Sequence, residues 1–109
     1  MNKFTVKTTI TSEDIDNIVD SALYSGISYW CSLAEVGRHI EGVKFMSEEI
    51  SRGGTLKLTD SEDGKVYLLT RAKILKGVSL YNNHDFEQYD ASDSDNIIQL
   101  AIFDKIIYG

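Results

Sequence analysis

Apolar residues in the segment 15–23 recur at the spacing of an α-helix, and this pattern limits the possible fold more than any other in the chain. A helix with such a stripe has to bury one face against another element. Thr11 or Ser12 is a suitable N-cap, Thr11 with Asp14 resembles a capping box, and Gly26 suits the position after the last turn. The sequence therefore predicts a capped first helix that stops at this glycine. The residues of the stripe are Ile15, Ile18, Val19, Ala22 and Leu23.

The segment 27–31, directly after this helix, holds the only tryptophan, the only cysteine and one of the six tyrosines. Large aromatic side chains bury much area and either anchor a core or line a ligand face. We interpret Trp30 and Cys31 as packed residues of a strand over 27–36. Tyr29 is expected to be the most exposed of the three, and it is a candidate ligand contact.

Alternating and periodic patterns elsewhere in the first half predict two further elements, a strand and a short helix. Residues 3–10 alternate between apolar and polar side chains, which is typical of a strand. No clear period is present over 37–44. A short helix is expected over 45–52, with Ser47 as its cap and Gly53-Gly54 as its end.

The second half predicts a hairpin followed by two helices. Strands at 55–59 and 65–69 flank the turn-rich connector 60–64. The later elements are a helix capped by Thr70, a polar loop at 82–90, a helix that Asp93 or Ser94 caps and that runs to about Phe103, and a short strand at 106–108. The predicted fold is one α+β domain over 1–109, with a small antiparallel sheet packed against about four helices.

The last predicted helix carries apolar side chains around almost its whole circumference. A helix of that kind should be buried on all sides, and a domain of 109 residues offers few such places. Two explanations fit: an interface between the subunits of a homo-oligomer, which we prefer, or a central position inside the monomer. The apolar residues are Ile97, Ile98, Leu100, Ala101, Ile102 and Phe103.

Charge and cysteine content restrict the partners and the compartment. The net charge of -6 argues against non-specific binding of nucleic-acid polymers, yet it leaves room for a small anionic ligand held by two or three local donors. A single cysteine cannot form an internal disulfide, which suits a reducing cytoplasm. We expect no signal peptide in the first residues, and no apolar run approaches the ~20 residues of a membrane helix.

No catalytic or metal-binding motif stands out, so the sequence predicts neither an enzyme nor a cofactor. His39 and His84 are isolated, and nothing near Cys31 suggests an activating base. The acidic residues at 60–63 lack the spacing of a calcium loop and are expected to form a solvated turn.

Two groups of residues are candidate ligand contacts. Arg52 followed by Gly53 and Gly54 offers a phosphate-binding side chain beside open backbone, although the same residues suit a plain helix end. Arg71 and Lys73 are either surface charges or further anion contacts.

The second group surrounds the last predicted helix. Phe86 in the polar loop offers a ring for stacking, and the amides of Asn96 and Gln99 both donate and accept, which suits adenine. The alternative is that Phe86 packs into the core and Asn96 faces solvent.

With these residues in view, the chain resembles the phage anti-Thoeris sponge family, small proteins that sequester cyclic ADP-ribose signals. The resemblance covers nearly the whole chain and rests on the order and spacing of several segments. These are Phe-Thr-Val-Lys-Thr-Thr-Ile-Thr (4–11), Ser-Tyr-Trp-Cys (28–31), Ser-Arg-Gly-Gly-Thr-Leu-Lys-Leu (51–58), Leu-Lys-Gly (75–77) and Asp-Asn-Ile-Ile-Gln-Leu-Ala (95–101).

The resemblance implies a non-enzymatic role in the cytoplasm of an infected bacterium. Thoeris immunity makes a cyclic ADP-ribose isomer from NAD, and a sponge binds this messenger tightly and leaves it intact. Members of the family assemble as homo-oligomers with messenger pockets between subunits, and some take up cyclic oligonucleotides at a second site.

The family pattern of an aromatic residue and an asparagine ten positions apart in the pocket matches Phe86 and Asn96. Arg52 would neutralise the diphosphate, and Arg71 is a second candidate for that role. Two other functions remain open: a small acidic phage inhibitor that binds a host protein directly, and a small nucleotide hydrolase.

Overall fold

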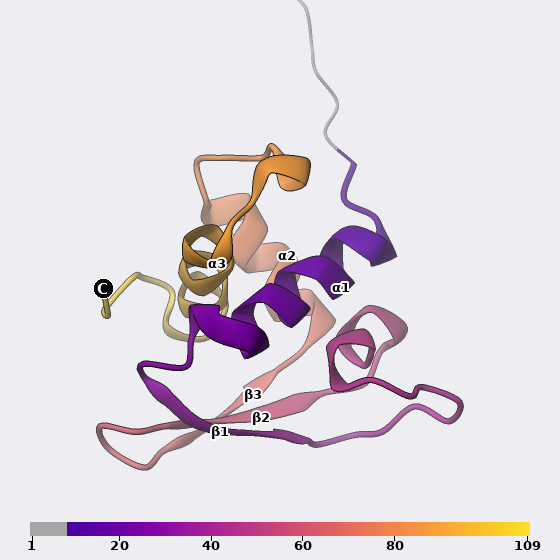
Figure 1. The fold of residues 1–109 in the computed structure, drawn as a ribbon, viewed down its shortest axis with the longest axis horizontal. Coiled ribbons are helices and arrows are strands. Elements are labelled where there is room, and N and C mark those ends of the chain that lie inside the picture. Colours follow the sequence, from indigo (N-terminus) through magenta and orange to yellow (C-terminus); the bar gives the residue numbers. More distant parts are fainter. Residues whose placement is uncertain (1–8) are drawn as a thin grey trace, which may run out of the picture.

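A three-stranded antiparallel sheet carries the helices on one of its faces in the computed structural model, which describes residues 9–109 (Figure 1). The strand predicted at 3–10 therefore lies almost wholly outside the described residues. The sheet has the order β1 (Cys31–Val36), β2 (Leu56–Asp60), β3 (Val66–Leu69). The helices are α1 (Ser12–Ser21), its π-helical continuation η1 (Ala22–Gly26), α2 (Arg71–Leu80) and α3 (Ala91–Phe103), and the short 3-10 turns are η2 (Met46–Glu48), η3 (Ile50–Arg52) and η4 (Phe86–Gln88).

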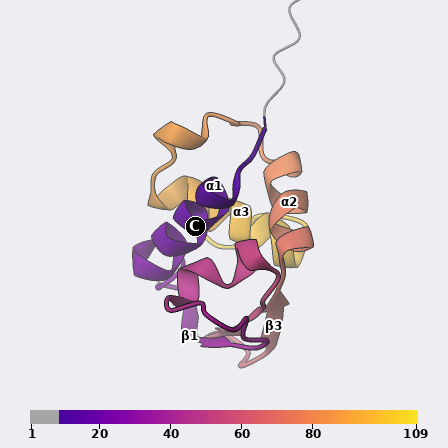
Figure 2. The same ribbon diagram turned by 90° about the vertical axis from the view of Figure 1, so that its right-hand side faces the viewer.

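The register of the sheet sets which side chains face the helices. Leu58 of β2 lies opposite Ala34 of β1 and Tyr67 of β3. Leu56 and Leu58 are fully buried beneath the helices, which Figure 2 shows above the sheet. The predicted hairpin and the α+β class are thus confirmed.

The start of the first helix follows the prediction, and its end does not. The Thr11 hydroxyl accepts from the Asp14 N–H at 3.1 Å, and the Asp14 carboxylate accepts from the Thr11 N–H at 2.8 Å, which completes the capping box. Gly26, however, is not a left-handed cap. It ends the π-helical turn where a Cβ would lie 2.7 Å from the Ala91 carbonyl oxygen, so the glycine allows the close approach of α3.

The predicted strand over 27–36 begins later than expected. The N–H groups of Trp30 and Cys31 both donate to the Ile27 carbonyl, which forms a tight turn before β1. Trp30 is only 1% exposed, so its interpretation as a core residue is confirmed. Cys31 is half-buried at the start of the strand.

The predicted helix over 45–52 is two 3-10 turns, and Ser47 does not cap it. Gly53 ends η3 in the left-handed conformation, at a φ of 94°. Gly54 has no room for a side chain, because a Cβ would lie 2.6 Å from the Glu49 carboxylate and 2.7 Å from the Arg38 carbonyl oxygen. The predicted end of this segment at Gly53 and Gly54 is therefore confirmed.

Side-chain caps begin both later helices. The Thr70 hydroxyl caps α2 as predicted, by accepting from the Lys73 N–H. The expected cap of α3 was wrong by a few residues. Asp90 is the N-cap, and Asp93 completes a reciprocal capping box from inside the helix. The segment 106–108 is not a strand, since its backbone bonds to a side chain of α3 instead of to the sheet.

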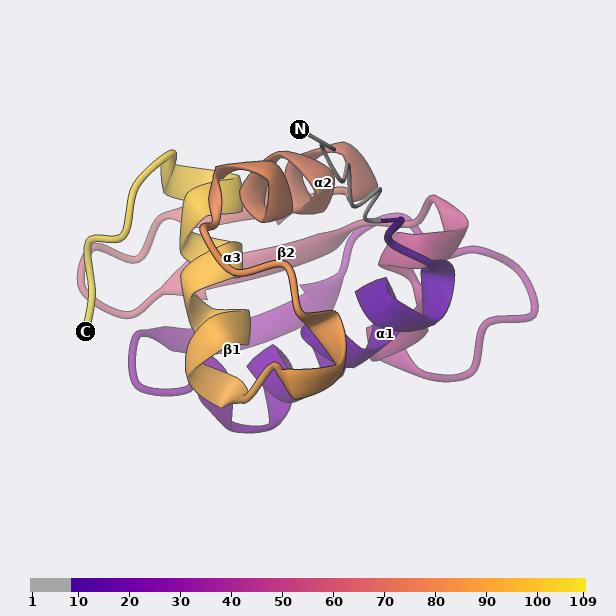
Figure 3. The same ribbon diagram turned by 90° about the horizontal axis from the view of Figure 1, so that it is seen from above.

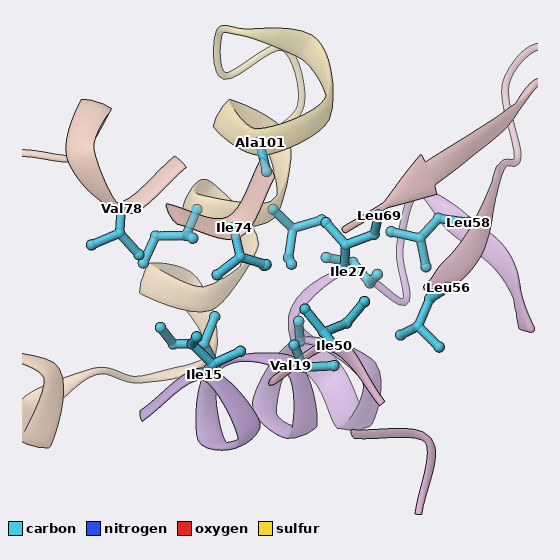
Figure 4. Packing of buried hydrophobic residues seen from close by; sticks show 14 of the residues in the cluster. Ile15, Val19, Ile27, Ile50, Leu56, Leu58, Leu69, Ile74, Val78 and Ala101 are labelled. Carbon is cyan, nitrogen blue, oxygen red and sulfur yellow. The ribbon is translucent and has the colours of Figure 1, made fainter. Parts of the chain in front are cut away.

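The apolar circumference of α3 is covered largely by the protein's own elements. Ile97, Ile98 and Ala101 are at most 1% exposed, and α3 contacts α1, η1, α2 and β3. Figure 4 shows Ala101 facing the cluster that Ile74 and Leu69 also enter. The preferred explanation, a subunit interface, is thus not needed to bury this helix. No helix among residues 9–109 is both long and apolar enough to cross a membrane.

The close crossing of α2 and α3 generates a stability prediction. An alanine replacing a glycine inside a helix ordinarily stabilises by about 1 kcal/mol. At Gly77, however, a Cβ would lie 2.5 Å from the Ile97 carbonyl oxygen. We expect Gly77→Ala to lower the free energy of unfolding by about 1–3 kcal/mol in urea titrations. Ser79 is exposed on the same helix, and Ser79→Ala should change the free energy of unfolding by less than about 0.5 kcal/mol. A Gly77→Ala protein as stable as the parent would contradict the close approach of α2 and α3 at this position.

Candidate functional site

Three hollows surround the loop between α2 and α3. The Asn96 hollow, of about 380 Å³, is lined by Leu80, Tyr81, Asn82, Asn96, Leu100 and Ile106. The acidic hollow, of about 430 Å³, lies between α1 and η4 and includes Glu13, Asp14, Phe86, Glu87 and Ser94. The apolar hollow, of about 210 Å³, is lined by Ile10, Leu75, Val78, Ser79, His84 and Phe86.

The Asn96 hollow combines hydrogen-bonding groups with an apolar rim. The Asn96 amide donates to the Tyr81 hydroxyl at 3.4 Å, and this hydroxyl donates to the Asp93 carboxylate. Burial and the bond to Asp93 raise the pKa of Tyr81, so the phenol stays neutral at physiological pH. Leu80 is 53% exposed and Ile106 47% exposed. The hollow is therefore an open, uncharged site that a second surface could close.

Phe86 lines the other two hollows and not the one that contains Asn96. Its half-buried ring lies edge-on to Tyr89 at 5.5 Å, and Tyr89 in turn lies edge-on to Tyr81 at 6.0 Å. Phe86 and Asn96 thus lie at opposite ends of a row of tyrosine rings. A single chain does not bring the two residues into one hollow.

The candidate anion contacts lie at the far end of α2 from the Asn96 hollow. Arg71 is the first residue of this ten-residue helix, so it is about 14 Å from Leu80 at the other end. Its guanidinium donates to the Ser51 carbonyl oxygen. Arg52 pairs with the Glu48 carboxylate at 3.5 Å, and the Lys73 ammonium donates to the Leu68 carbonyl oxygen at 2.7 Å.

Gln99 is fully buried and its amide is used within the protein. The amide nitrogen donates to the Asp95 carboxylate at 2.8 Å, and the amide oxygen accepts from the N–H groups of Ile107 and Tyr108 at 2.8 Å each. Gln99 therefore fastens the C-terminal segment to α3. It lines none of the three hollows.

Asp95, which the sequence did not single out, organises the buried polar groups. Its carboxylate is 7% exposed and accepts from the Trp30 indole at 2.8 Å and from the Tyr29 hydroxyl at 2.6 Å, besides Gln99. The Tyr29 ring remains 55% exposed, as predicted, but its hydroxyl is held by this bond. The spacing of Asp95 and Gln99, one turn apart on an apolar helix, was the available signal for this network.

The C-terminal segment closes over the aromatic core. The Tyr108 ring stacks on Trp30 with centroids 5.5 Å apart, and its hydroxyl donates to Asp60 at 2.7 Å. Asp60 is 1% exposed, so the expectation of a solvated acidic turn was wrong for this residue, while Glu62 and Asp63 are exposed as predicted. In Figure 3 this segment follows the end of α3.

The remaining titratable candidates have structural roles. The His39 ring bonds to the carboxylate of Glu49, which is 2% exposed and also accepts from the Ile40 N–H. The imidazole of His84 bonds to the Val78 carbonyl oxygen. Burial raises the pKa of the Cys31 thiol, which disfavours the nucleophilic thiolate. Among residues 9–109, no three His, Cys, Asp or Glu side chains are grouped to hold a metal ion.

Comparisons with known proteins identified no relative of this chain. No protein-family model, no curated protein and no solved structure matches the chain. The functional argument therefore depends on the residues and their geometry.

The hydrogen-bonded tyrosines generate a prediction for alkaline pH. Burial and the bond to Asp95 raise the pKa of Tyr29 to about 12, and the bond to Asp60 with burial raises the pKa of Tyr108 to about 12. Below pH 10 these phenols are neutral in both states, and above it they ionise first in the unfolded chain. We therefore expect the urea midpoint to fall between pH 10 and 12.

Single substitutions test whether the hydrogen-bonded tyrosines cause this fall in the urea midpoint. Tyr108→Phe should reduce the difference between midpoints measured at pH 9 and pH 11.5, because it removes one of the phenols whose folded-state pKa is raised. Tyr24→Phe is the matched control, since Tyr24 is 88% exposed. Equal reductions in the two variants would contradict the assignment.

Proposed function

We propose that this protein is a phage-encoded sponge that binds a cyclic ADP-ribose isomer in the infected host cell and leaves it chemically intact. The observation that carries the proposal is the Asn96 hollow. Its lining places a hydrogen-bonding amide and a phenol between apolar side chains. This combination suits a purine, which needs flat apolar contact and groups that both donate and accept.

The charge distribution supports a site completed by a second subunit. The side chains that line the Asn96 hollow are uncharged, so they cannot neutralise a diphosphate. Arg52 and Arg71 lie near each other, at the other end of α2, since both bond to residues of 48–51. A neighbouring chain that presents these arginines to the Asn96 hollow would supply the missing positive charge.

A two-chain site also accounts for the separation of Phe86 and Asn96. The exposed apolar side chains that line the two hollows offer a contact surface for another subunit: Leu75 is 40% exposed, Leu80 53% and Ile106 47%. Phe86 would receive the ligand from its apolar hollow, because the carboxylates of the acidic hollow repel phosphate. Capture would depend on short-range contacts, since the net charge of -6 does not attract anions from a distance.

A direct inhibitor of a host protein is the second candidate, and the uncovered sheet face favours it. Leu33, Val66 and Leu68 are 50%, 58% and 44% exposed there. Val66→Lys separates the two functions. It should abolish capture of a host protein under this alternative and leave messenger binding unchanged under the sponge function.

The sponge function is tested by ligand protection and ligand recovery. Cyclic ADP-ribose isomers should raise the melting temperature and be released unchanged on heating, as judged by mass spectrometry. Asn96→Ala should weaken binding at least tenfold, about 1.4 kcal/mol, by removing the amide. Asn17→Ala, on α1 and outside the Asn96 hollow, is the matched control and should bind as the parent does. Recovery of a ring-opened product would rule out a sponge.

Subunit mixing tests whether the pocket is shared. Phe86→Ala and Asn96→Ala homo-oligomers should each bind poorly. When the two proteins are unfolded together and refolded, mixed oligomers should regain a fraction of the sites, because some pockets then combine both native residues. Binding that stays lost in the mixture would show that both residues act within one chain.

A further inference from the structure

The acidic hollow is a second, partly open space, and Phe86 is the one residue that it shares with either of the other two hollows. It lies between the first half of α1 and the η4 turn, and the start of α3 also lines it. Its volume of about 430 Å³ is within the ~300–1,000 Å³ of small-molecule sites. It shares Phe86 with the apolar hollow but contains none of the residues of the Asn96 hollow.

The charge of this hollow is negative. Glu13 and Asp14 come from α1, and Glu87 comes from η4, so carboxylates approach from two different elements. The lining residues include no Lys, Arg or His among residues 9–109. The Asp14 carboxylate accepts one backbone N–H, from Thr11, and this neutral bond leaves its charge in place.

A buried hydroxyl in the lining is left without a partner. Ser94 is 1% exposed, and its Oγ atom makes no hydrogen bond within residues 9–109. A buried hydroxyl without a hydrogen bond costs about 1–3 kcal/mol. Ser94 also lines the hollow, and since its Oγ atom is buried, rotation of the side chain toward the hollow would let a ligand N–H provide the missing partner.

Two aromatic rings complete the lining. Phe86 and Tyr89 lie edge to face with centroids 5.5 Å apart, and the Tyr89 hydroxyl is held by the Asn83 carbonyl oxygen. Burial, together with the negative charges of Asp93, Asp14 and Asp85, raises the pKa of Tyr89 to about 12. The same potential that opposes a phenolate favours a cation, and aromatic faces attract cations as well.

We propose that the acidic hollow binds a small organic cation of the aliphatic diamine or polyamine class. Carboxylates on both α1 and η4 suit a ligand with ammonium groups at two separated positions. The methylene chain between them would lie against Phe86 and Tyr89, and one ammonium N–H would reach Ser94. The volume of about 430 Å³, lined from α1, η4 and α3, favours a free small molecule over the basic side chain of a partner protein. This site shares the Phe86 ring with the proposed messenger site, but its carboxylates and Ser94 line neither of the other two hollows.

Titration calorimetry of the purified full-length protein with spermidine tests the proposal. Saturable binding should appear, and 1,4-butanediol, which has no charge, should not bind. Glu13→Gln with Glu87→Gln should weaken spermidine binding at least tenfold. The double variant Glu35→Gln with Glu41→Gln changes the net charge equally at exposed positions outside the hollow, and it should bind spermidine within twofold of the parent.

Ser94→Ala provides the second measurement. Because the hydroxyl makes no hydrogen bond within residues 9–109, this variant should fold and be at least as stable as the parent in urea, yet bind spermidine several-fold more weakly. Unchanged affinity in Ser94→Ala would overturn the assigned geometry. Absence of spermidine binding at millimolar concentration, equal losses in the two double variants, or binding of a lysine-rich peptide but not of spermidine would each overturn the proposal.

Discussion

The rest of the structure depends on the hydrogen bonds that the buried carboxylate of Asp95 accepts. It accepts from the indole of Trp30, the hydroxyl of Tyr29 and the amide of Gln99, and Gln99 in turn holds the backbone of the C-terminal segment. Hydrogen bonds to a charged acceptor at low exposure are strong, and leaving any of these donors unpaired would be costly. This one side chain therefore joins α3, the turn before β1 and the C-terminal segment.

This network also determines where a ligand can bind. One side of α3 is occupied by Asp95 and Gln99, and the closely packed Ile97, Ile98 and Ala101 fill most of the remainder. Asn96 is half-buried beside Tyr81 on the surface that remains. The Asn96 hollow and the acidic hollow both border the loop between α2 and α3, at opposite ends of its row of aromatic rings.

The two sites differ in charge, and that difference separates their ligands. The Asn96 hollow is uncharged and needs cations from elsewhere before it can hold a diphosphate. The acidic hollow carries carboxylates of Glu13, Asp14 and Glu87 and favours cations as it stands. Under the proposed sponge function, the arginines of a second subunit would supply this positive charge, which would link messenger binding to assembly.

Short sequence patterns were sufficient to predict the capped start of α1, the cap of α2, the hairpin and the glycines after η3. Each of these features depends on residues that are only a few positions apart. These gave the α+β class correctly. Contacts between distant residues decided the rest: Gly26 meets Ala91 instead of forming a left-handed cap, Asp60 is buried by Tyr108, and Gln99 is used by the C-terminal segment. A pattern of residue types cannot reveal such contacts, since burial and hydrogen-bond partners arise only when separate segments pack. The family resemblance implied that Phe86 and Asn96 line one pocket, while the packed chain places their side chains in different hollows.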